Sequence, residues 1–334
     1  MDNQNNKKKP IALITGISGQ DGSYLSEYLL SLNYEVHGIV RRHSVAENQS
    51  MRLNNFIDKV HLHYADITDV HSLRTVFEKV KPDEVYNLAA MSHVRISFDV
   101  PAYTIETNSL GVLNVLEMVR TIVPNAKFYQ ASSSEMFGNS VEEDGFQKLK
   151  TPMNPVSPYG CSKLLGYNLT RHYRKAYNLH TCNGILFNHE SPRRGTNFVT
   201  NKVVKTAVEI KYGKADKLEL GNLDSYRDWG HSKDYVRAMH MIVNNKTPDD
   251  FIVATGKTYS VREMCQYVFK RLHLNYEDYV VQNPQYIRPE ELRYLKGDAS
   301  KVIEELGWEP TYTFESMLDE MIEYWSADYR KDRV

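Results

Sequence analysis

The chain has 334 residues, of which 41% are hydrophobic, enough to build the core of one large or two medium-sized domains. Its formal net charge is -1, which does not favour nucleic acid or an anionic membrane surface as a partner, and it has no run of ~18 apolar residues that would span a membrane. The three cysteines form neither a metal-ligand spacing nor an even disulfide set, which fits a reducing compartment and predicts a cytoplasmic protein without a metal site.

The first predicted strand, Ile11 to Thr15, leads directly into a glycine-rich turn, Gly16-Ile17-Ser18-Gly19-Gln20-Asp21-Gly22. Apolar residues at helical spacing then predict a helix from Ser23 to Leu32. Glycines between a strand and a helix allow a tight turn and a close backbone approach to a pyrophosphate at the helix N-terminus. The stretch therefore predicts a dinucleotide site, and the alternative is a tight turn without a ligand.

The second predicted strand, Tyr34 to Val40, ends in Arg41-Arg42. A chain that binds NAD usually has an acidic residue here for the ribose hydroxyls. Guanidinium groups suit the additional 2′-phosphate of NADP instead. We therefore predict NADP as the cofactor, and the alternative is a solvated arginine pair at the start of a loop.

Two further strands are predicted at Val60 to Ala65 and at Glu84 to Leu88. After the first of them, Asp66 is expected to contact the adenine, and Asp69 is expected to cap a helix from Val70 to Val80. After the second, the small residues of Ala89-Ala90-Met91-Ser92 would let the cofactor lie against the backbone.

A helix is predicted from Asn108 to Val119, with a structural role for Asn108, and Tyr103 just before it is a candidate for a cofactor contact. The fifth strand, Lys127 to Gln130, leads into Ala131-Ser132-Ser133-Ser134-Glu135-Met136-Phe137-Gly138. Ser133 and Glu135 are two residues apart, so an extended strand end would point both side chains the same way.

Tyr159 and Lys163 are four residues apart, so they share one face of a predicted helix. An ammonium group near a phenol favours the phenolate, so we expect Lys163 to lower the pKa of Tyr159 from its usual value of ~10. A phenol tuned in this way can take a proton from a sugar hydroxyl. The alternative is a surface tyrosine beside a surface lysine.

Alternating strands and helices of these lengths predict an α/β fold with a right-handed, doubly wound parallel sheet of the Rossmann type. Ligands of such sheets bind beyond the carboxyl ends of the strands. Gly16, Asp66, Ala89 and Ser133 all follow or end predicted strands. We therefore expect these residues to form one site.

A sixth strand, Thr181 to Phe187, ends in Asn188-His189-Glu190-Ser191-Pro192-Arg193-Arg194-Gly195, and the regular alternation fades after this run. We predict a cofactor domain at 10–195, to which segments at roughly 225–258 return, and a smaller mixed α/β substrate domain formed by 196–224 and 259–330. Candidates for gripping a diphosphate are Arg193, Lys202, Arg227 and Arg288, and the alternative for each is a solvated cation. The later predicted helices are Phe198 to Tyr212, Lys233 to Val243, Val261 to Leu272 with a Ser260 cap, Lys301 to Leu306 and Phe314 to Tyr329.

On these motifs the chain resembles the extended short-chain dehydrogenase/reductase family, and within it the GDP-mannose 4,6-dehydratase subgroup. The motifs that carry the resemblance are the glycine-rich turn, Arg41-Arg42, Asn87-Leu88-Ala89-Ala90, Ala131 to Gly138, Tyr159 to Lys163, Phe187 to Gly195, Arg227-Asp228-Trp229 and Arg288-Pro289-Glu290. The run from Asn188 to Gly195 is specific to the subgroup, as is the Ser133 and Glu135 pair. Related dehydratases for thymidine nucleotides carry Asp-Glu there, and epimerases of the family lack the glutamate.

The resemblance implies conversion of GDP-mannose to GDP-4-keto-6-deoxymannose with NADP, in a homo-oligomer that is a dimer or a tetramer. It implies catalysis by Ser133, Glu135, Tyr159 and Lys163. It implies cofactor contacts by Gly16, Ser18, Gly19, Gln20, Asp21, Arg41, Asp66, Ile67, Leu88, Ala89, Ala90, Ser92, Tyr103, Lys163, His189 and Arg194. It implies substrate contacts by Ser92, Asn188, Lys202, Gly221, Arg227, Arg288 and Glu291.

Two positions depart from the family pattern. Ser133 stands where bacterial members often have threonine, which keeps the hydroxyl. His43 follows Arg41-Arg42 where many members have serine, in a loop that crosses between subunits in the family. The alternative functions are a sugar-nucleotide epimerase of the same fold, an NADP-sensing regulator, and a dehydratase that also reduces its keto product to GDP-rhamnose.

Overall fold

A seven-stranded parallel sheet organises the computed structural model, which describes residues 8–42 and 50–331. The strand order is β11-β6-β5-β4-β1-β2-β3, and the order reverses beside β1, where doubly wound sheets form their ligand crevice. The predicted Rossmann-type sheet is confirmed. Its strands are β1 (Ile11–Thr15), β2 (Glu35–Val40), β3 (Val60–Tyr64), β4 (Glu84–Asn87), β5 (Lys127–Ser133), β6 (Thr181–Leu186) and β11 (Asp250–Val253).

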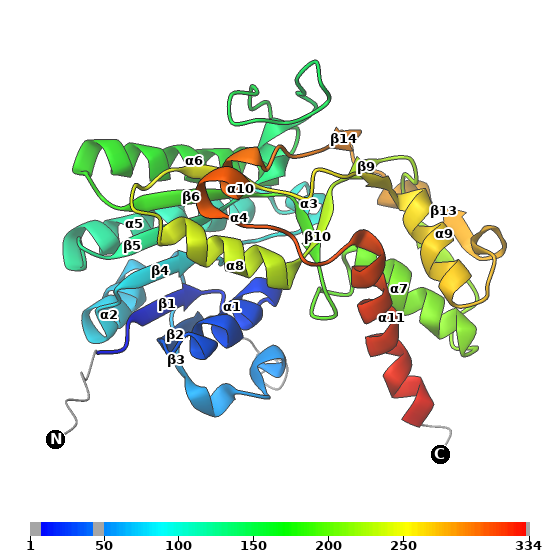
Figure 1. Ribbon diagram of the computed structural model, residues 1–334, viewed down its shortest axis with the longest axis horizontal. Helices are drawn as coiled ribbons and strands as arrows, with labels where there is room; N and C mark the ends of the chain where they lie inside the picture. Colours follow the sequence, from blue (N-terminus) through cyan, green and yellow to red (C-terminus); the bar gives the residue numbers. More distant parts are fainter. Residues whose placement is uncertain (1–7, 43–49, 332–334) are drawn as a thin grey trace.

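Helices cover both faces of this sheet (Figure 1). On one face, α1 (Gln20–Ser31) packs against α8 (Ser232–Val243), and both contribute to a core with β1 and β6. On the other face, α2 (Val70–Val80), α5 (Gly111–Ile122) and α6 (Pro158–Tyr177) pack side by side. Burial on both faces explains why most of these strands are apolar.

Most predicted helices lie within a few residues of their expected bounds, because their caps and periodicity are local signals. Asp69 accepts hydrogen bonds from the backbone N–H groups of His71 and Ser72 and so caps α2 as predicted. Asn108 does not begin an α-helix as predicted. It lies in a π-helical turn, Glu106–Leu110, that joins α4 (Pro101–Ile105) to α5. Its amide pairs with the backbone N–H and C=O of Met91, which agrees with the predicted structural role.

A second region with its own core lies beside the carboxyl ends of the main strands (Figure 1). It is built on α7 (Val199–Lys211), α9 (Val261–Arg271) and α11 (Phe314–Lys331), and Ser260 with Glu263 forms a capping box on α9. Short strands surround these helices: β8 (Leu218–Leu220) pairs with β13 (Val280–Gln282), β9 (Tyr226–Arg227) with β12 (Tyr259–Ser260) and β14 (Tyr294–Leu295), and β7 (Asn188–Glu190) with β10 (Trp229–His231). The predicted domain boundaries stay a prediction.

Two short helices pack on the main sheet's layers. α10 (Ser300–Leu306) packs against α8 and β11, and α3 (Val94–Ser97) packs against α6.

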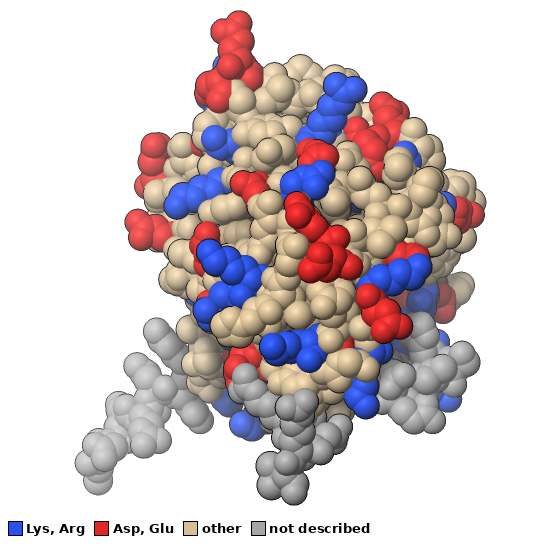
Figure 2. Space-filling model, turned by 90° about the vertical axis from the view of Figure 1, so that its right-hand side faces the viewer, with Lys and Arg blue, Asp and Glu red and all other residues tan. Residues whose placement is uncertain are grey.

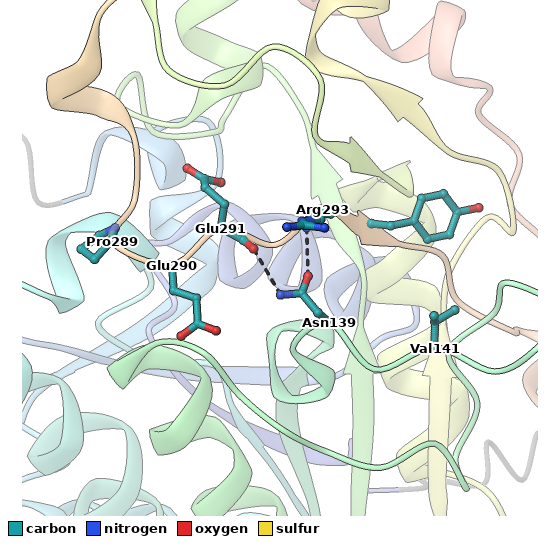
Figure 3. Close-up of a pocket in the computed structure, with 7 residues that line it drawn as sticks. Asn139, Val141, Pro289, Glu290, Glu291 and Arg293 are labelled. Atoms are coloured by element: carbon teal, nitrogen blue, oxygen red, sulfur yellow. Dashed lines mark hydrogen bonds between the residues drawn. The ribbon is translucent and has the colours of Figure 1, made fainter.

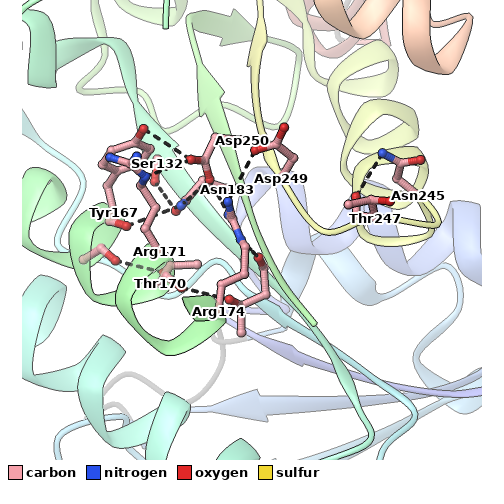
Figure 4. Close-up of polar contacts among 12 residues, drawn as sticks. Ser132, Tyr167, Thr170, Arg171, Arg174, Asn183, Asn245, Thr247, Asp249 and Asp250 are labelled. Atoms are coloured by element: carbon pink, nitrogen blue, oxygen red, sulfur yellow. Dashed lines mark hydrogen bonds and ion pairs between the residues drawn. The ribbon is translucent and has the colours of Figure 1, made fainter. Parts of the chain in front are cut away.

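A buried polar cluster holds the β11 edge of the sheet (Figure 4). The Asp250 carboxylate forms ion pairs with Arg174 and with Arg171, whose Nε lies 3.2 Å away. It also accepts hydrogen bonds from Asn183 at 2.8 Å and from the Tyr167 hydroxyl at 3.3 Å. These contacts join α6, β6 and β11.

The face in Figure 2 shows acidic and basic side chains interspersed, in keeping with a net charge near zero. Among the helices of the described residues, none combines the length and the apolar character that crossing a membrane requires.

Candidate active site

The glycine-rich turn leaves no room for larger side chains at two of its glycines. Gly16 has a φ of +71°, and a Cβ there would lie 3.0 Å from the Ala89 backbone. A Cβ on Gly22 would lie 2.4 Å from the Gly16 carbonyl oxygen. The Thr15 hydroxyl accepts hydrogen bonds from the N–H groups of Leu88 and Ala89, which ties the turn to the end of β4. The turn therefore has the close packing that a dinucleotide cradle requires.

The start of α1 is joined to β7 by an ion pair between residues 168 positions apart. His189 Nε2 lies 2.7 Å from an Asp21 carboxylate oxygen, and His189 Nδ1 donates to the Phe187 carbonyl oxygen at 2.8 Å. Burial disfavours both charges, but their mutual attraction outweighs it, lowering the pKa of Asp21 and raising that of His189. Gln20 also donates to the His189 carbonyl oxygen. Three of the predicted cofactor residues therefore meet here.

Two predicted NADP contacts, Arg41 and Asp66, closely follow the carboxyl ends of β2 and β3. Arg41 donates a hydrogen bond to the hydroxyl of Tyr103, which is another predicted cofactor contact. Asp66 accepts from the Thr68 N–H at 2.9 Å and from its hydroxyl at 2.8 Å. The Ile67 side chain is buried, so only its backbone can face a ligand. The predicted subunit-crossing loop that begins at His43 lies outside the described residues.

Other predicted cofactor positions line the same edge. Ser18 offers its carbonyl oxygen to Arg52, and the Gly19 N–H donates to the Gly16 carbonyl oxygen. Beyond β4, Ala90 is half-buried and Ser92 is exposed.

Ser133 and Glu135 are adjacent and buried, but they do not share an extended strand. Ser133 ends β5, whereas Glu135 lies in the 3₁₀ helix Ser134–Phe137, so the prediction that both lie on a strand end is wrong. The backbone N–H of Glu135 donates to the Ser133 hydroxyl at 3.2 Å. The chain turns after Ser133 because its side chain caps this short helix.

One oxygen of the Glu135 carboxylate is paired and the other is not. Oε1 lies 3.3 Å from Nη1 of Arg288, 153 residues further along the chain. Oε2 is buried and has no hydrogen-bond partner within the described part of the chain. An unpaired buried oxygen is costly unless a ligand or water satisfies it, and such groups concentrate at functional sites.

Tyr159 and Lys163 lie on the first turns of α6, whose N-terminus Ser157 caps. Lys163 Nζ lies 5.8 Å from the centre of the Tyr159 ring and donates at 2.9 Å to the Ala131 carbonyl oxygen. Burial raises the pKa of Tyr159 to about 12, although a hydrogen bond with Ser133 partly opposes the shift. Burial also lowers the pKa of Lys163 to about 8. The expectation that Lys163 lowers the tyrosine pKa is therefore wrong in this structure, because burial outweighs the Ser133 hydrogen bond and the Arg194 charge that oppose it.

The predicted substrate cations occupy the second region and its loops. Arg227 of β9 is buried and donates to the carbonyl oxygens of Tyr226 and Leu292. Burial and the nearby Arg288 charge lower the pKa of Arg227 to about 10. The Arg288 backbone N–H donates to the Glu291 carboxylate at 2.8 Å. Arg227, Arg288 and Glu291 therefore lie together beside Glu135.

Lys202 and Gly221 both approach Tyr286, Lys202 at the aromatic ring and Gly221 at the backbone. Lys202 Nζ lies 3.8 Å from the centre of the Tyr286 ring, and a Cβ on Gly221 would lie 2.7 Å from the Tyr286 carbonyl oxygen. Asn188 starts β7 beside Trp229 of β10.

Two predicted cations are engaged with nearby side chains. Arg193 donates to Ser23 and to Glu27 of α1, and its guanidinium lies 4.0 Å from the centre of the Tyr24 ring. The Arg193 guanidinium is therefore engaged with α1, and the other predicted diphosphate cations lie elsewhere. Arg194, a predicted cofactor contact, pairs with buried Glu190 at 3.0 Å.

A surface hollow of about 570 Å³ borders the segments that carry Glu135 and Arg288 (Figure 3). Asn139 joins these segments, because its amide donates to the Glu291 carbonyl oxygen and accepts from the Arg293 N–H. The sequence analysis missed Asn139 and Arg293. The only local signal for Asn139 is its position directly after the Ala131 to Gly138 motif. The hollow is lined by Asn139, Val141, Pro289, Glu290, Glu291, Arg293 and Tyr294.

Comparisons with known proteins identify the family of the chain. A family model described as GDP-mannose 4,6 dehydratase matches residues 13–321. GDP-mannose 4,6 dehydratase 2 of Arabidopsis thaliana is 48% identical over 94% of this chain and 86% of its own length. GDP-mannose 4,6 dehydratase of Drosophila melanogaster is 45% identical over 96% and 87%.

A likeness to a solved structure supports the fold. The structure of dTDP-glucose 4,6-dehydratase from Bacillus anthracis in complex with NAD has a TM-score of 0.81 and 24% identity, covering 96% of this chain and 98% of that one. At this identity, the likeness shows the fold alone. The family match and the two relatives, which span nearly the whole chain, show that the chain belongs to the GDP-mannose 4,6-dehydratase family.

Proposed function

We propose that the protein is an NADP-dependent hydro-lyase that converts GDP-mannose to GDP-4-keto-6-deoxymannose. Membership of the family supports the reaction and the substrate. The observation that carries the catalytic assignment is the meeting of Ser133, Tyr159 and a buried Glu135 with one unpaired carboxylate oxygen. An epimerase of the same fold needs the hydroxyl and the phenol but has no use for this carboxylate.

The residues present fit a bound dinucleotide. Gly16 and Gly22 keep the first turn free of side chains, and the N-terminus of α1 provides N–H groups for a pyrophosphate. Arg41 would hold the 2′-phosphate of NADP, and Lys163 would hold the ribose next to the nicotinamide. When bound, NADP supplies an acceptor for the hydride from C4 of the sugar and returns that hydride to C6, so none is consumed overall.

Tyr159 acts first, by taking the proton from the sugar O4 as C4 is oxidised to a ketone. The Ser133 hydroxyl donates a hydrogen bond to the same oxygen and stabilises its developing charge. A phenol with a pKa of about 12 is protonated at neutral pH, so ligand binding must bring positive charge toward Tyr159 before this step. The Lys163 ammonium is the nearby group that can supply it, by moving from the Ala131 carbonyl oxygen.

Glu135 acts second, by removing the C5 proton that the new C4 ketone has made acidic. Glu135 then gives this proton to the C6 hydroxyl, which leaves as water. Pairing of Oε1 with Arg288 orients the carboxylate, while Oε2 is available to take the proton. After the hydride has reached C6, a proton returns to C5 and the 4-keto-6-deoxy sugar is complete.

The diphosphate and the base of the substrate are assigned to the second region. Arg227, Arg288 and Lys202 would neutralise the diphosphate, with Glu291 holding the backbone of Arg288. Ser92, Asn188 and Gly221 are the remaining proposed substrate contacts. We further propose a cytoplasmic homo-oligomer, in line with the three free cysteines.

Product identification tests this proposal. The protein is incubated with NADP and GDP-mannose carrying deuterium at C4, and the sugar is analysed by mass spectrometry and NMR. The expected product has lost one water and carries the deuterium at C6. A GDP-hexose that keeps its C6 hydroxyl would indicate an epimerase, and NADP binding without turnover would indicate a regulator. A second incubation with excess NADPH shows whether the keto product is reduced further.

A further inference from the structure

One edge of the main sheet has polar side chains where a parallel sheet is normally apolar. Along β2 and β3, Glu35, His37, His61 and His63 alternate with apolar or small residues. In the parallel register His37 lies directly opposite His61, with His63 two residues further along β3, the edge strand. Because side chains alternate across a strand, these four lie on one face, the face that Ile39 shares with the core around α2.

The four side chains contact one another closely. His37 Nε2 lies 2.9 Å from a Glu35 carboxylate oxygen, and His37 Nδ1 lies 2.9 Å from His63 Nε2. The His37 ring stacks on that of His61, with ring centres 4.6 Å apart. One ligand atom each from Glu35, His37 and His61 lies within 4.8 Å of the other two. This spacing allows all three to reach a single ion after small side-chain rotations.

We propose that Glu35, His37 and His61 form a binding site for a divalent metal ion of the zinc type. Two imidazole nitrogens and one carboxylate oxygen are a common zinc ligand set, which leaves a fourth position for water. The ion takes the place of the proton between His37 Nε2 and the Glu35 carboxylate, and this proton moves to His37 Nδ1, so that the ring binds as a neutral imidazole. Nδ1 then donates to His63 Nε2, which orients the ring as an outer-shell partner.

The surroundings favour a nitrogen-preferring metal over calcium or magnesium. Two of the three ligands are imidazoles, and only one carboxylate belongs to the cluster. Calcium and magnesium need several oxygen ligands, whereas zinc is bound well by imidazole. A surface hollow of about 480 Å³, lined in part by Glu35 and His61, gives the ion access from solvent.

The site is separate from the candidate active site. Glu35 and His61 lie near the amino ends of β2 and β3, whereas the catalytic residues lie beyond the carboxyl ends of the strands. A bound ion would join the edge strand to its neighbour and stabilise the folded chain by mass action. No metal site is predictable from the sequence here, because the three ligands come from two strands and form no local spacing motif.

Titration with zinc tests the proposal on the full chain, purified without a histidine tag and stripped with a chelator. Calorimetry is expected to show one zinc ion per chain, with a rise in melting temperature. His61→Gln and Glu35→Gln are expected to weaken binding by ~10–100-fold or more, since even loss of an outer-shell partner costs this much. His71→Gln replaces an exposed histidine of α2 outside the cluster and is expected to bind zinc like the wild type.

Cobalt provides a second measurement that does not depend on stability. Tetrahedral cobalt with nitrogen and oxygen ligands absorbs visible light strongly, and this absorption is expected in the wild type and in His71→Gln but not in His61→Gln. Absence of stoichiometric zinc binding by the wild type would overturn the proposal. So would equal binding by His61→Gln, because the ion would then lie elsewhere.

Discussion

Replacing Glu135 with glutamine tests the proposed elimination step, because it removes the base and keeps nearly the same shape. Glutamine still offers a carbonyl oxygen to Arg288, so the 3.3 Å contact can be kept while the charge and the basicity are lost. Proton-transfer groups contribute ~10²–10⁴-fold, so kcat should fall by this factor, or about 3–5 kcal/mol of transition-state stabilisation.

The assay follows the C5 proton. In deuterated water the wild type should form a keto product that carries deuterium at C5, because the proton that returns comes from solvent. The variant should form this product at the reduced rate and bind NADP as tightly as the wild type, since within residues 8–42 and 50–331 Glu135 bonds to Ser133, Gly138 and Arg288, none of them a predicted cofactor contact. Glu143→Gln changes an exposed glutamate of the following loop and is the matched control. Full activity in Glu135→Gln would refute the assignment of the second base.

Three further predictions concern the cofactor, the sheet edge and pH. Arg41→Ala should weaken NADP binding by ~10–100-fold and leave NAD binding unchanged, because only the 2′-phosphate loses a charge-assisted hydrogen bond; calorimetry with both cofactors would contradict this if they weakened equally. Asp250→Ala should lower the free energy of unfolding by ~1–3 kcal/mol, measured with urea, because buried Asn183 loses an acceptor and Arg174 keeps only its ion pair with Asp249; a loss near zero would show these contacts to be dispensable. The lowered pKa of Asp21 gives stability that is lost as pH falls through its folded value, and the raised pKa of His189 gives stability that is lost as pH rises through its folded value. The pair should therefore contribute most between about pH 4 and 6.5, so His189→Asn should lower the stability most in that range and reduce the fall in stability on either side of it; an unchanged profile would contradict the ion pair.

Much of the fold was predictable because its signals are local. The strand Ile11–Thr15, the glycine-rich turn and the Asp69 cap on α2 depend on residues that are neighbours in sequence. Regular alternation of short apolar strands and amphipathic helices then leaves the doubly wound parallel sheet as the favoured topology. Most predicted catalytic and cofactor residues follow strand ends, and such a sheet brings those ends to one edge.

Contacts between distant segments and the charges they set were decided only by the tertiary structure. Glu135 meets Arg288 across 153 residues, and His189 meets Asp21 across 168, distances at which sequence spacing carries no geometric information. The pKa of Tyr159 was predicted in the wrong direction because a helix face reports which side chains are near but not how deeply they are buried. Burial is a property of the assembled layers, and here it is the largest cause of the shift in the tyrosine pKa.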